Sequence, residues 1–207
     1  MKKLILFIAI LAVSIATSQT QFEQGMGKAM QLWGENKNTE ASAMFERIAA
    51  AEKNSWLPNY YIAAVNTFAA FGTKDKDQMT AMLNKSQAAI DIEMTKNANN
   101  SEILVMQAMI YTAWVSSDPM TNGMKLSGKI MELYEKAEAI DPKNPRAVFG
   151  KADFAIGGAQ WTGANVKELC KDIEKAVTLF DTFKPETVFS PNWGKDRALN
   201  QQKSCKK

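Results

Sequence analysis

Residues 129–147 constrain the fold more than any other stretch, because they combine a patterned helix with two well-placed prolines. Pro142 ends the predicted helix, since the residue before a proline is pushed out of the α region. Pro145 suits the first turn of a second helix, where its missing N–H removes no hydrogen bond. The first helix presents an apolar stripe at helical spacing, made of Ile130, Leu133, Tyr134, Ala137 and Ile140. This stretch therefore predicts two helices joined by a short turn.

The rest of the chain repeats this alternation of helices and breaks. Helical segments follow one another from Phe22 onward, and each break carries Gly, Pro or a cluster of Asn and Ser. The first helices of successive pairs are predicted to begin near residues 22, 58, 102, 146 and 193, a period that indicates a helical solenoid. Runs of alternating β-branched residues are missing, which favours an all-α protein. We therefore predict one all-α domain over residues 19–207, with about four antiparallel helical hairpins and a C-terminal helix.

The first 18 residues have the pattern of a secretory signal peptide. Lys2 and Lys3 precede an apolar run over residues 4–15, and small residues up to Ser18 offer a cleavage site. The alternative is a transmembrane anchor, but the apolar run is shorter than the roughly 20 residues needed to span a bilayer. No cysteine lies directly after the apolar run, so no lipid anchor is expected. We predict cleavage, a periplasmic or secreted mature protein and no membrane insertion afterwards.

Charge and residue types argue against several classes of function. The net charge of +3 is small, which gives no reason to expect nucleic acid or an anionic membrane as partner. The chain contains no histidine, which excludes histidine-based acid–base catalysis and most zinc sites. The sequence has no phosphate-binding loop and no calcium-binding loop. We therefore expect a protein without enzymatic activity, cofactor or metal site.

Cys170 and Cys205 are the only cysteines, and two interpretations of them stay open. In an oxidising compartment an even pair is typical of one disulfide. Such a bond would stabilise the fold by about 4 kcal/mol in the chain-entropy model. Alternatively, Cys170 is a small buried apolar side chain and Cys205 lies free on the tail. The pair is therefore a candidate disulfide.

The spacing of Tyr134, Ala137 and Pro142 resembles the second half of a tetratricopeptide repeat. In that repeat the aromatic fills the gap between two helices and the small residue lets them approach closely. An Ala-x-x-Tyr pair ending at Tyr111 resembles the first-helix half. The end of the chain, KPETVFSPNWGKDRAL, is similar to secreted tetratricopeptide-like proteins of Bacteroidetes-type bacteria. The resemblance implies a right-handed solenoid of helical hairpins.

Two departures from the repeat are visible within the resemblance, which covers about residues 22–184. The third and fourth repeats are about ten residues too long. We expect the excess to form loops within hairpins, over residues 116–124 and 157–163. Insertions at one edge of a solenoid tend to lie on one face, so Trp161 in the second loop is a candidate recognition residue. The alternative is a hairpin turn whose tryptophan packs on a neighbour.

In the tetratricopeptide family the first helix of each pair lines a concave surface, so the resemblance implies a binding groove there. Aromatic rings with polar tips suit such grooves, because one end is apolar and the other can hydrogen-bond. The alternative is that these rings pack between repeats. The candidate binding residues on the predicted first helices are Trp33, Tyr60, Tyr61, Asn66, Phe68, Tyr111 and Trp114.

These features predict two functions of different kinds. The first is a non-catalytic adaptor or scaffold of the cell envelope that binds a protein or peptide. The alternative is a periplasmic carrier that holds a small molecule in a cavity between helices. The sequence names neither the partner nor the oligomeric state.

Overall fold

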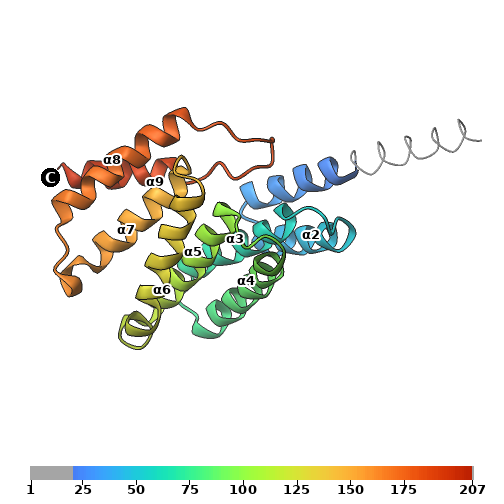
Figure 1. The fold of residues 1–207 in the computed structure, drawn as a ribbon. Coiled ribbons are helices and arrows are strands. Elements are labelled where there is room, and N and C mark those ends of the chain that lie inside the picture. The colour runs from blue at the N-terminus through green and yellow to red at the C-terminus, as the bar shows by residue number, and fades with distance from the viewer. Residues whose placement is uncertain (1–20, 207) are drawn as a thin grey trace, which may run out of the picture.

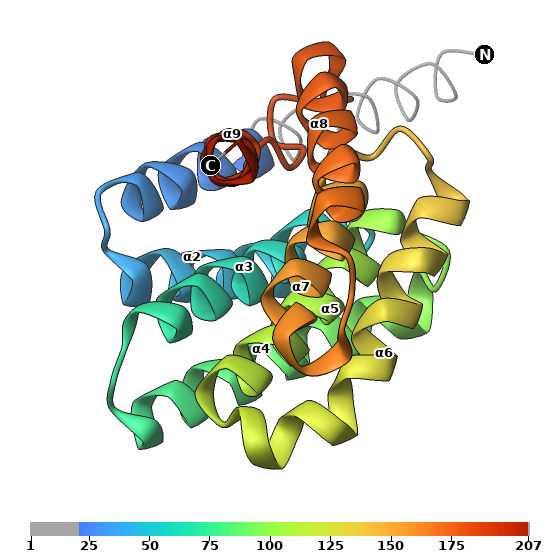
Figure 2. The same cartoon turned by 90° about the vertical axis from the view of Figure 1, so that its left-hand side faces the viewer.

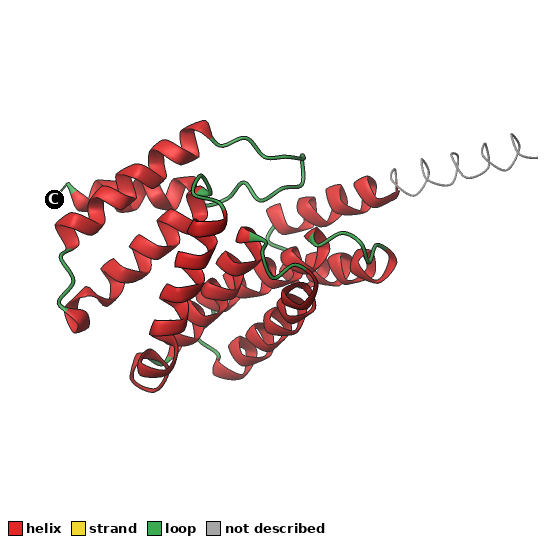
Figure 3. Ribbon diagram, in the orientation of Figure 1, coloured by secondary structure: helices red, strands yellow, loops and turns green. Residues whose placement is uncertain are grey.

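The computed structural model describes residues 21–206, and this part of the chain folds into nine helices without a strand (Figures 1 and 3). The predicted signal peptide, residues 1–18, lies outside the described residues. The first helix covers residues 21–34. It is followed by α2 (Asn38–Ala51), α3 (Leu57–Gly72), α4 (Lys76–Lys96), α5 (Ser101–Ser117), α6 (Pro119–Ile140), α7 (Pro145–Thr162), α8 (Val166–Thr182) and α9 (Lys195–Cys205).

The helices pair as antiparallel hairpins that stack side by side, as Figures 1 and 2 show. Consecutive helices pack within the pairs α3–α4, α5–α6 and α7–α8. The first helices of these pairs also pack in a row, α3 against α5 and α5 against α7. The prediction of an all-α array of helical hairpins with a C-terminal helix is therefore confirmed.

Side-chain caps start two helices of the row, α7 and α5, near the predicted places. Asn144 accepts hydrogen bonds from the backbone N–H groups of Arg146 and Ala147, and Pro145 occupies the first turn of α7. Asn100 caps α5 in the same way. Residues 129–147 thus form the end of α6, a short turn and the start of α7, as their sequence predicts.

The predicted insertion loops are wrong in both hairpins. α5 continues to Ser117 and α6 begins at Pro119, so Asp118 alone separates them and caps α6 by accepting from the Thr121 N–H. α7 continues through Gly157 and Gly158 to Thr162 and stops at Gly163, which has a φ of 70°. The extra residues lengthen helices, because a glycine inside a helix costs only about 1 kcal/mol relative to alanine. Trp161 therefore lies in the last turn of α7.

The stripe predicted for α6 packs against α5 and α7. Ile130, Tyr134 and Ala137 are buried, whereas Ile140 at the helix end is partly exposed. Gly150 of α7 faces the ring of Tyr134, and a Cβ atom at this position would overlap that ring. The tight contact between α6 and α7 therefore depends on a residue without a side chain.

Residues 183–194, here called the strap, return from α8 along the row of first helices before α9 begins (Figure 1). The Trp193 Nε1–H donates to the Tyr60 hydroxyl at 2.8 Å, and the Tyr61 hydroxyl donates to the Phe189 carbonyl at 2.8 Å. The ring of Phe22 meets that of Phe189 edge-on. These contacts fasten the C-terminal part of the chain to the first helix and α3.

A disulfide then ties the end of α9 to α8. The sulfur atoms of Cys170 and Cys205 are bonded, and their Cα atoms lie 5.8 Å apart. α9 itself buries little, since Ala198 is its one fully buried residue. The covalent bond is therefore a major attachment of this helix.

Candidate functional site

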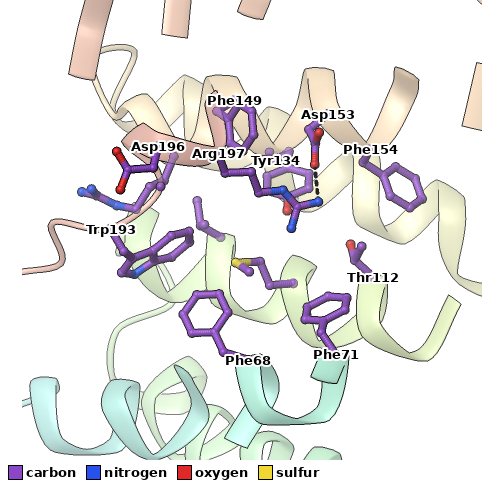
Figure 4. A pocket seen from close by; sticks show the side chains of 15 residues that line it. Phe68, Phe71, Thr112, Tyr134, Phe149, Asp153, Phe154, Trp193, Asp196 and Arg197 are labelled. Carbon is purple, nitrogen blue, oxygen red and sulfur yellow. Dashed lines mark hydrogen bonds and ion pairs between the residues drawn. The ribbon is translucent and has the colours of Figure 1, made fainter. Parts of the chain in front are cut away.

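A cavity of about 350 Å³ lies between the row of first helices and the C-terminal segment (Figure 4). Its volume falls near the lower end of the range of about 300–1,000 Å³ that is common for ligand pockets. Six of its lining residues are aromatic. The lining consists of Phe68, Phe71, Val105, Met109, Thr112, Tyr134, Arg146, Phe149, Gly150, Asp153, Phe154, Trp193, Gly194, Asp196 and Arg197.

The helical repeat explains why these side chains meet. Val105, Met109 and Thr112 are spaced four and three residues apart, so they share one face of α5 and form the middle of the wall. Phe68 and Phe71 come from the last turns of α3 on one side. α7 contributes the opposite side, and the strap and α9 close the remaining one.

Aromatic contacts close one end of the cavity. The ring of Trp193 meets that of Phe68 edge-on, with centroids 5.2 Å apart. Phe68 in turn stacks on Trp33, with centroids 5.9 Å apart. The cavity wall is therefore continuous with the aromatic core of the first hairpins, and a bound ring would meet fixed ring faces and edges.

A buried ion pair lies beside this closed end. The Nε–H and Nη2–H groups of Arg146 donate to Glu102 at 2.8 and 2.6 Å, and the Arg146 side chain is 1% exposed. The guanidinium lies over the rings of Phe183 and Trp193, 4.5 and 5.8 Å from their centroids. Burial alone would lower the pKa of Arg146, but the hydrogen bond and charge of Glu102 outweigh burial and raise that pKa. Arg146 is therefore a permanent cation that joins α5, α7 and the strap.

A second ion pair lies at the open end. The Arg197 Nη2–H donates to the Asp153 carboxylate at 2.7 Å, and the Arg197 side chain is 61% exposed. Figure 4 shows this pair above the cavity, with Phe71 and Thr112 across from it. An exposed arginine at the mouth can donate to a carboxylate on a ligand, because its guanidinium has further N–H groups.

Tyr60, Tyr61 and Asn66 do not face a groove, contrary to the sequence-based prediction. All three are buried, and burial is the main cause that raises the pKa of both tyrosine hydroxyls. The Asn66 side-chain amide donates to Ser42 and to the carbonyl of Ile62. The strap covers the tyrosines and takes both of their hydroxyls into its hydrogen bonds. These residues therefore stabilise packing.

The remaining sequence candidates also lie outside the cavity, with one exception. Trp33 and Trp114 pack against the core of the first hairpins, and Tyr111 packs against the core around α6. Phe68 alone of the predicted concave-face residues lines the cavity. Trp161 is 71% exposed on the surface.

Sequence reasoning missed most of the lining. Phe149 and Phe154 lie in α7, and residues five positions apart point in directions about 140° apart on a helix, so helical periodicity does not group them. Trp193 belongs to a loop that looks ordered in sequence, but nothing there indicates that it returns to α3.

Within residues 21–206, no group of three or more His, Cys, Asp or Glu side chains is arranged to hold a metal ion. No helix of that part of the chain is both long enough and apolar enough to cross a membrane. The cavity thus offers aromatic surface, one methionine thioether and charged groups at its ends. Such a lining suits binding of a flat, mostly apolar molecule.

Comparison with known proteins supports the fold. No protein-family model matches the chain, and no curated protein matches it by sequence. Among solved structures, the HusA haemophore from Porphyromonas gingivalis is similar with a TM-score of 0.77 and 23% sequence identity, over 89% of this chain and 92% of that one. A thermophilic TPR protein from Thermus thermophilus is similar with a TM-score of 0.58 and 9% identity, over 89% of this chain and 98% of that one. The chain therefore has a tetratricopeptide-like fold.

Proposed function

We propose that this protein is a non-catalytic carrier of a flat, largely apolar small molecule with a carboxylate, and that a porphyrin is its ligand. The observation that carries the proposal is the aromatic cavity of about 350 Å³ between the first helices and the C-terminal segment. This is the second of the two functions predicted from the sequence. The strap covers Tyr60 and Tyr61, two of the residues predicted to line a peptide-binding groove.

The chemistry of the cavity matches the ligand. A porphyrin has two apolar faces, which pair with Phe71, Phe149 and Phe154, and its carboxylates lie at one edge. Arg197 stands at the open end, where such an edge would emerge into water. A molecule larger than the cavity would extend from the mouth with its charged groups outward.

The likeness to a haemophore supports the same class of ligand. HusA is described as a haemophore, and this chain shares its fold over nearly the whole length of both. At 23% identity the likeness concerns the fold alone. The choice of a porphyrin as ligand therefore rests on the residues that line this chain's own cavity.

Recognition would rest on the macrocycle and not on iron. The chain has no histidine, and both cysteines form the disulfide. Tyr134 lines the cavity, but burial is the main cause that raises the pKa of its hydroxyl, so no phenolate is available near neutral pH. A metal-free porphyrin should therefore bind about as tightly as haem.

The predicted signal peptide would place this carrier outside the cytoplasm. Lys2 and Lys3, the apolar run over residues 4–15 and the small residues before Gln19 remain the basis for that placement. Sequencing the N-terminus of the protein purified from the native culture medium or envelope tests it. A first residue of Gln19 supports export with cleavage, and an intact Met1 in the cytoplasmic fraction contradicts it.

Equilibrium titration with haemin and with metal-free protoporphyrin tests the carrier function. Tryptophan fluorescence follows binding, and Phe71→Ala and Phe154→Ala each remove a ring from the wall. We expect saturable binding of both compounds and about tenfold weaker binding for each variant. Trp161→Ala removes an exposed ring outside the cavity and should leave affinity unchanged. Absence of saturable binding, or equal losses in all three variants, would refute the proposal.

Protein binding remains a second candidate because exposed apolar side chains gather on one edge. Figures 1 and 2 show the turns of α3–α4, α5–α6 and α7–α8 along that edge. Exposed large apolar residues near these turns are Phe71, Met120, Met124, Trp161 and Val166. Pull-down from the native envelope with the parent and with Met120→Lys/Met124→Lys tests this candidate. A stoichiometric partner that is lost in the variant supports it, and identical recovery contradicts it.

A further inference from the structure

The roof of the cavity belongs to the C-terminal segment. Trp193 and Gly194 end the strap, and Asp196 and Arg197 lie in the first turn of α9. Figure 4 shows Trp193, Asp196 and Arg197 on the side of the cavity opposite Phe71. A ligand in this cavity would touch residues that come from outside the row of first helices, so their position decides whether the cavity is closed.

The strap side of the roof is firmly fixed. Trp193 donates to the buried hydroxyl of Tyr60 and lies beside the buried guanidinium of Arg146. Gly194 follows immediately with a φ of 107°, a conformation that few residues other than glycine adopt. A change of backbone angles at Gly194 would move α9 while leaving Trp193 in place.

Apart from its disulfide, α9 is held by a small apolar contact, in which Ala198 is buried and Leu199 is partly buried against the core of α7 and α8. The helix has 11 residues and one fully buried side chain, Ala198, and isolated helices of that length are marginal in water. Each of its ion pairs, Arg197 with Asp153 and Lys195 with Asp181, has at least one strongly exposed member, and pairs near water contribute little to stability. The bond between Cys205 and Cys170 is therefore the main tether at the free end of α9.

We propose that α9 is a movable roof of the ligand cavity, locked by the Cys170–Cys205 disulfide and released by a dithiol reductant. This inference rests on the proposed carrier function for its consequence, which is faster ligand release from the reduced protein. Cys170 in α8 and Cys205 at the end of α9 are both partly exposed, so a small dithiol can reach the bond.

The reduction step is ordinary thiol–disulfide exchange. A thiolate of the dithiol attacks one cysteine sulfur and displaces the other cysteine as a thiolate. The second thiol of the reductant then displaces the protein sulfur from the mixed disulfide. The protein gains two electrons and two protons, and the dithiol becomes a disulfide. α9 is then connected to the rest of the fold only through Gly194 and its weak contacts.

Hydrogen exchange on the ligand-free protein tests the lock itself. The oxidised protein, the dithiol-treated protein and the Cys170→Ser/Cys205→Ser double variant are compared by mass spectrometry. We expect amides of residues 195–205 to exchange at least about tenfold faster in the two unbridged forms, with α3 and α5 unchanged. Equal protection of α9 in all three forms would overturn the inference.

Release of metal-free protoporphyrin tests the consequence, because a dithiol cannot reduce a metal in that probe. The bound probe is transferred to excess apomyoglobin and its fluorescence is followed. Dithiol should speed release from the parent at least about tenfold and have no effect on the double variant, which should release fast throughout. Release at the same rate from all forms would contradict the proposal that α9 is a movable roof of the cavity. If protoporphyrin never binds, the carrier function fails, and the exchange of α9 alone decides whether the disulfide locks it.

Discussion

The two ends of the cavity each carry an arginine paired with a carboxylate, but the pairs differ in almost every physical respect. At the closed end Arg146 is 1% exposed and holds Glu102 with several short hydrogen bonds. At the mouth Arg197 is 61% exposed and makes one hydrogen bond to Asp153. The first guanidinium lies over two aromatic rings of the C-terminal segment, whereas the second lies on α9 near water.

This difference suggests that the closed end of the cavity stabilises the fold and that the mouth contributes to ligand binding. Removing one partner of a buried pair leaves the other charge uncompensated, so the closed end should be essential to the fold. An exposed pair contributes little because water and salt screen it. Its arginine can then exchange the protein carboxylate for a ligand carboxylate at small cost. The closed end thus builds the cavity, and the mouth selects what enters it.

Arg146→Ala should have the largest effect. The substitution leaves the mostly buried Glu102 side chain, which is 13% exposed, without its cation and removes the contact with Phe183 and Trp193. We expect the free energy of unfolding to fall by about 3–5 kcal/mol, as measured by urea denaturation. A loss below about 1 kcal/mol would mean that the Arg146 pair contributes no more to stability than an exposed ion pair does.

A double variant sharpens that prediction. Arg146→Met/Glu102→Gln replaces both charges with neutral side chains of similar length, so no unpaired charge remains. It should recover a large part of the stability that Arg146→Ala loses. If the double variant is as unstable as the single one, packing of Arg146 matters more than its charge.

Gly150→Ala should have an intermediate effect at the wall between the two ends. The added Cβ overlaps the ring of Tyr134 and forces α6 and α7 apart. We expect a loss of about 1–3 kcal/mol in the free energy of unfolding. Gly157→Ala is the matched control, because it lies in the same helix with no heavy atom within 4 Å of the added Cβ. The control should gain up to about 1 kcal/mol, and a loss in both variants would show that helix geometry, not Tyr134, is responsible.

Arg197→Ala should have the smallest effect on the fold. The free energy of unfolding should change by less than about 1 kcal/mol, whereas affinity for protoporphyrin should fall about fivefold through the lost contact with a carboxylate. Lys195→Ala is the control, since it removes an exposed ion pair on the same helix outside the cavity. Equal affinity for both variants would mean that the mouth does not recognise the carboxylate.

Local patterns predicted the repeats well because helix ends and helix faces are local properties. The turn after α6 was predicted from Pro142 and Pro145, and the buried face of α6 was predicted from the apolar stripe. The structure confirms both. The predicted insertion loops are wrong because glycine and proline do not always end a helix. Pro119 begins a helix and Gly157 lies inside one.

The lining of the cavity could not be predicted, because it depends on a contact between distant parts of the chain. Trp193 meets Tyr60 across 133 positions in sequence, and no local periodicity encodes that return. Once the strap lies there, the aromatics at the start of α3 become core and those at its end become cavity wall. The type of each residue was visible in the sequence, but its surroundings were not.

The most direct test of the carrier function is chemical-shift mapping of the amide and indole N–H signals during titration with metal-free protoporphyrin. A porphyrin ring strongly shifts protons that lie above or beside it, so the signals report its position. We expect the largest shifts at the Trp193 indole and at the backbone of residues 105–112 and 149–154, at one porphyrin per chain. Shifts confined to the edge near Met120 and Trp161, or no shifts at saturating porphyrin, would contradict binding in the aromatic cavity.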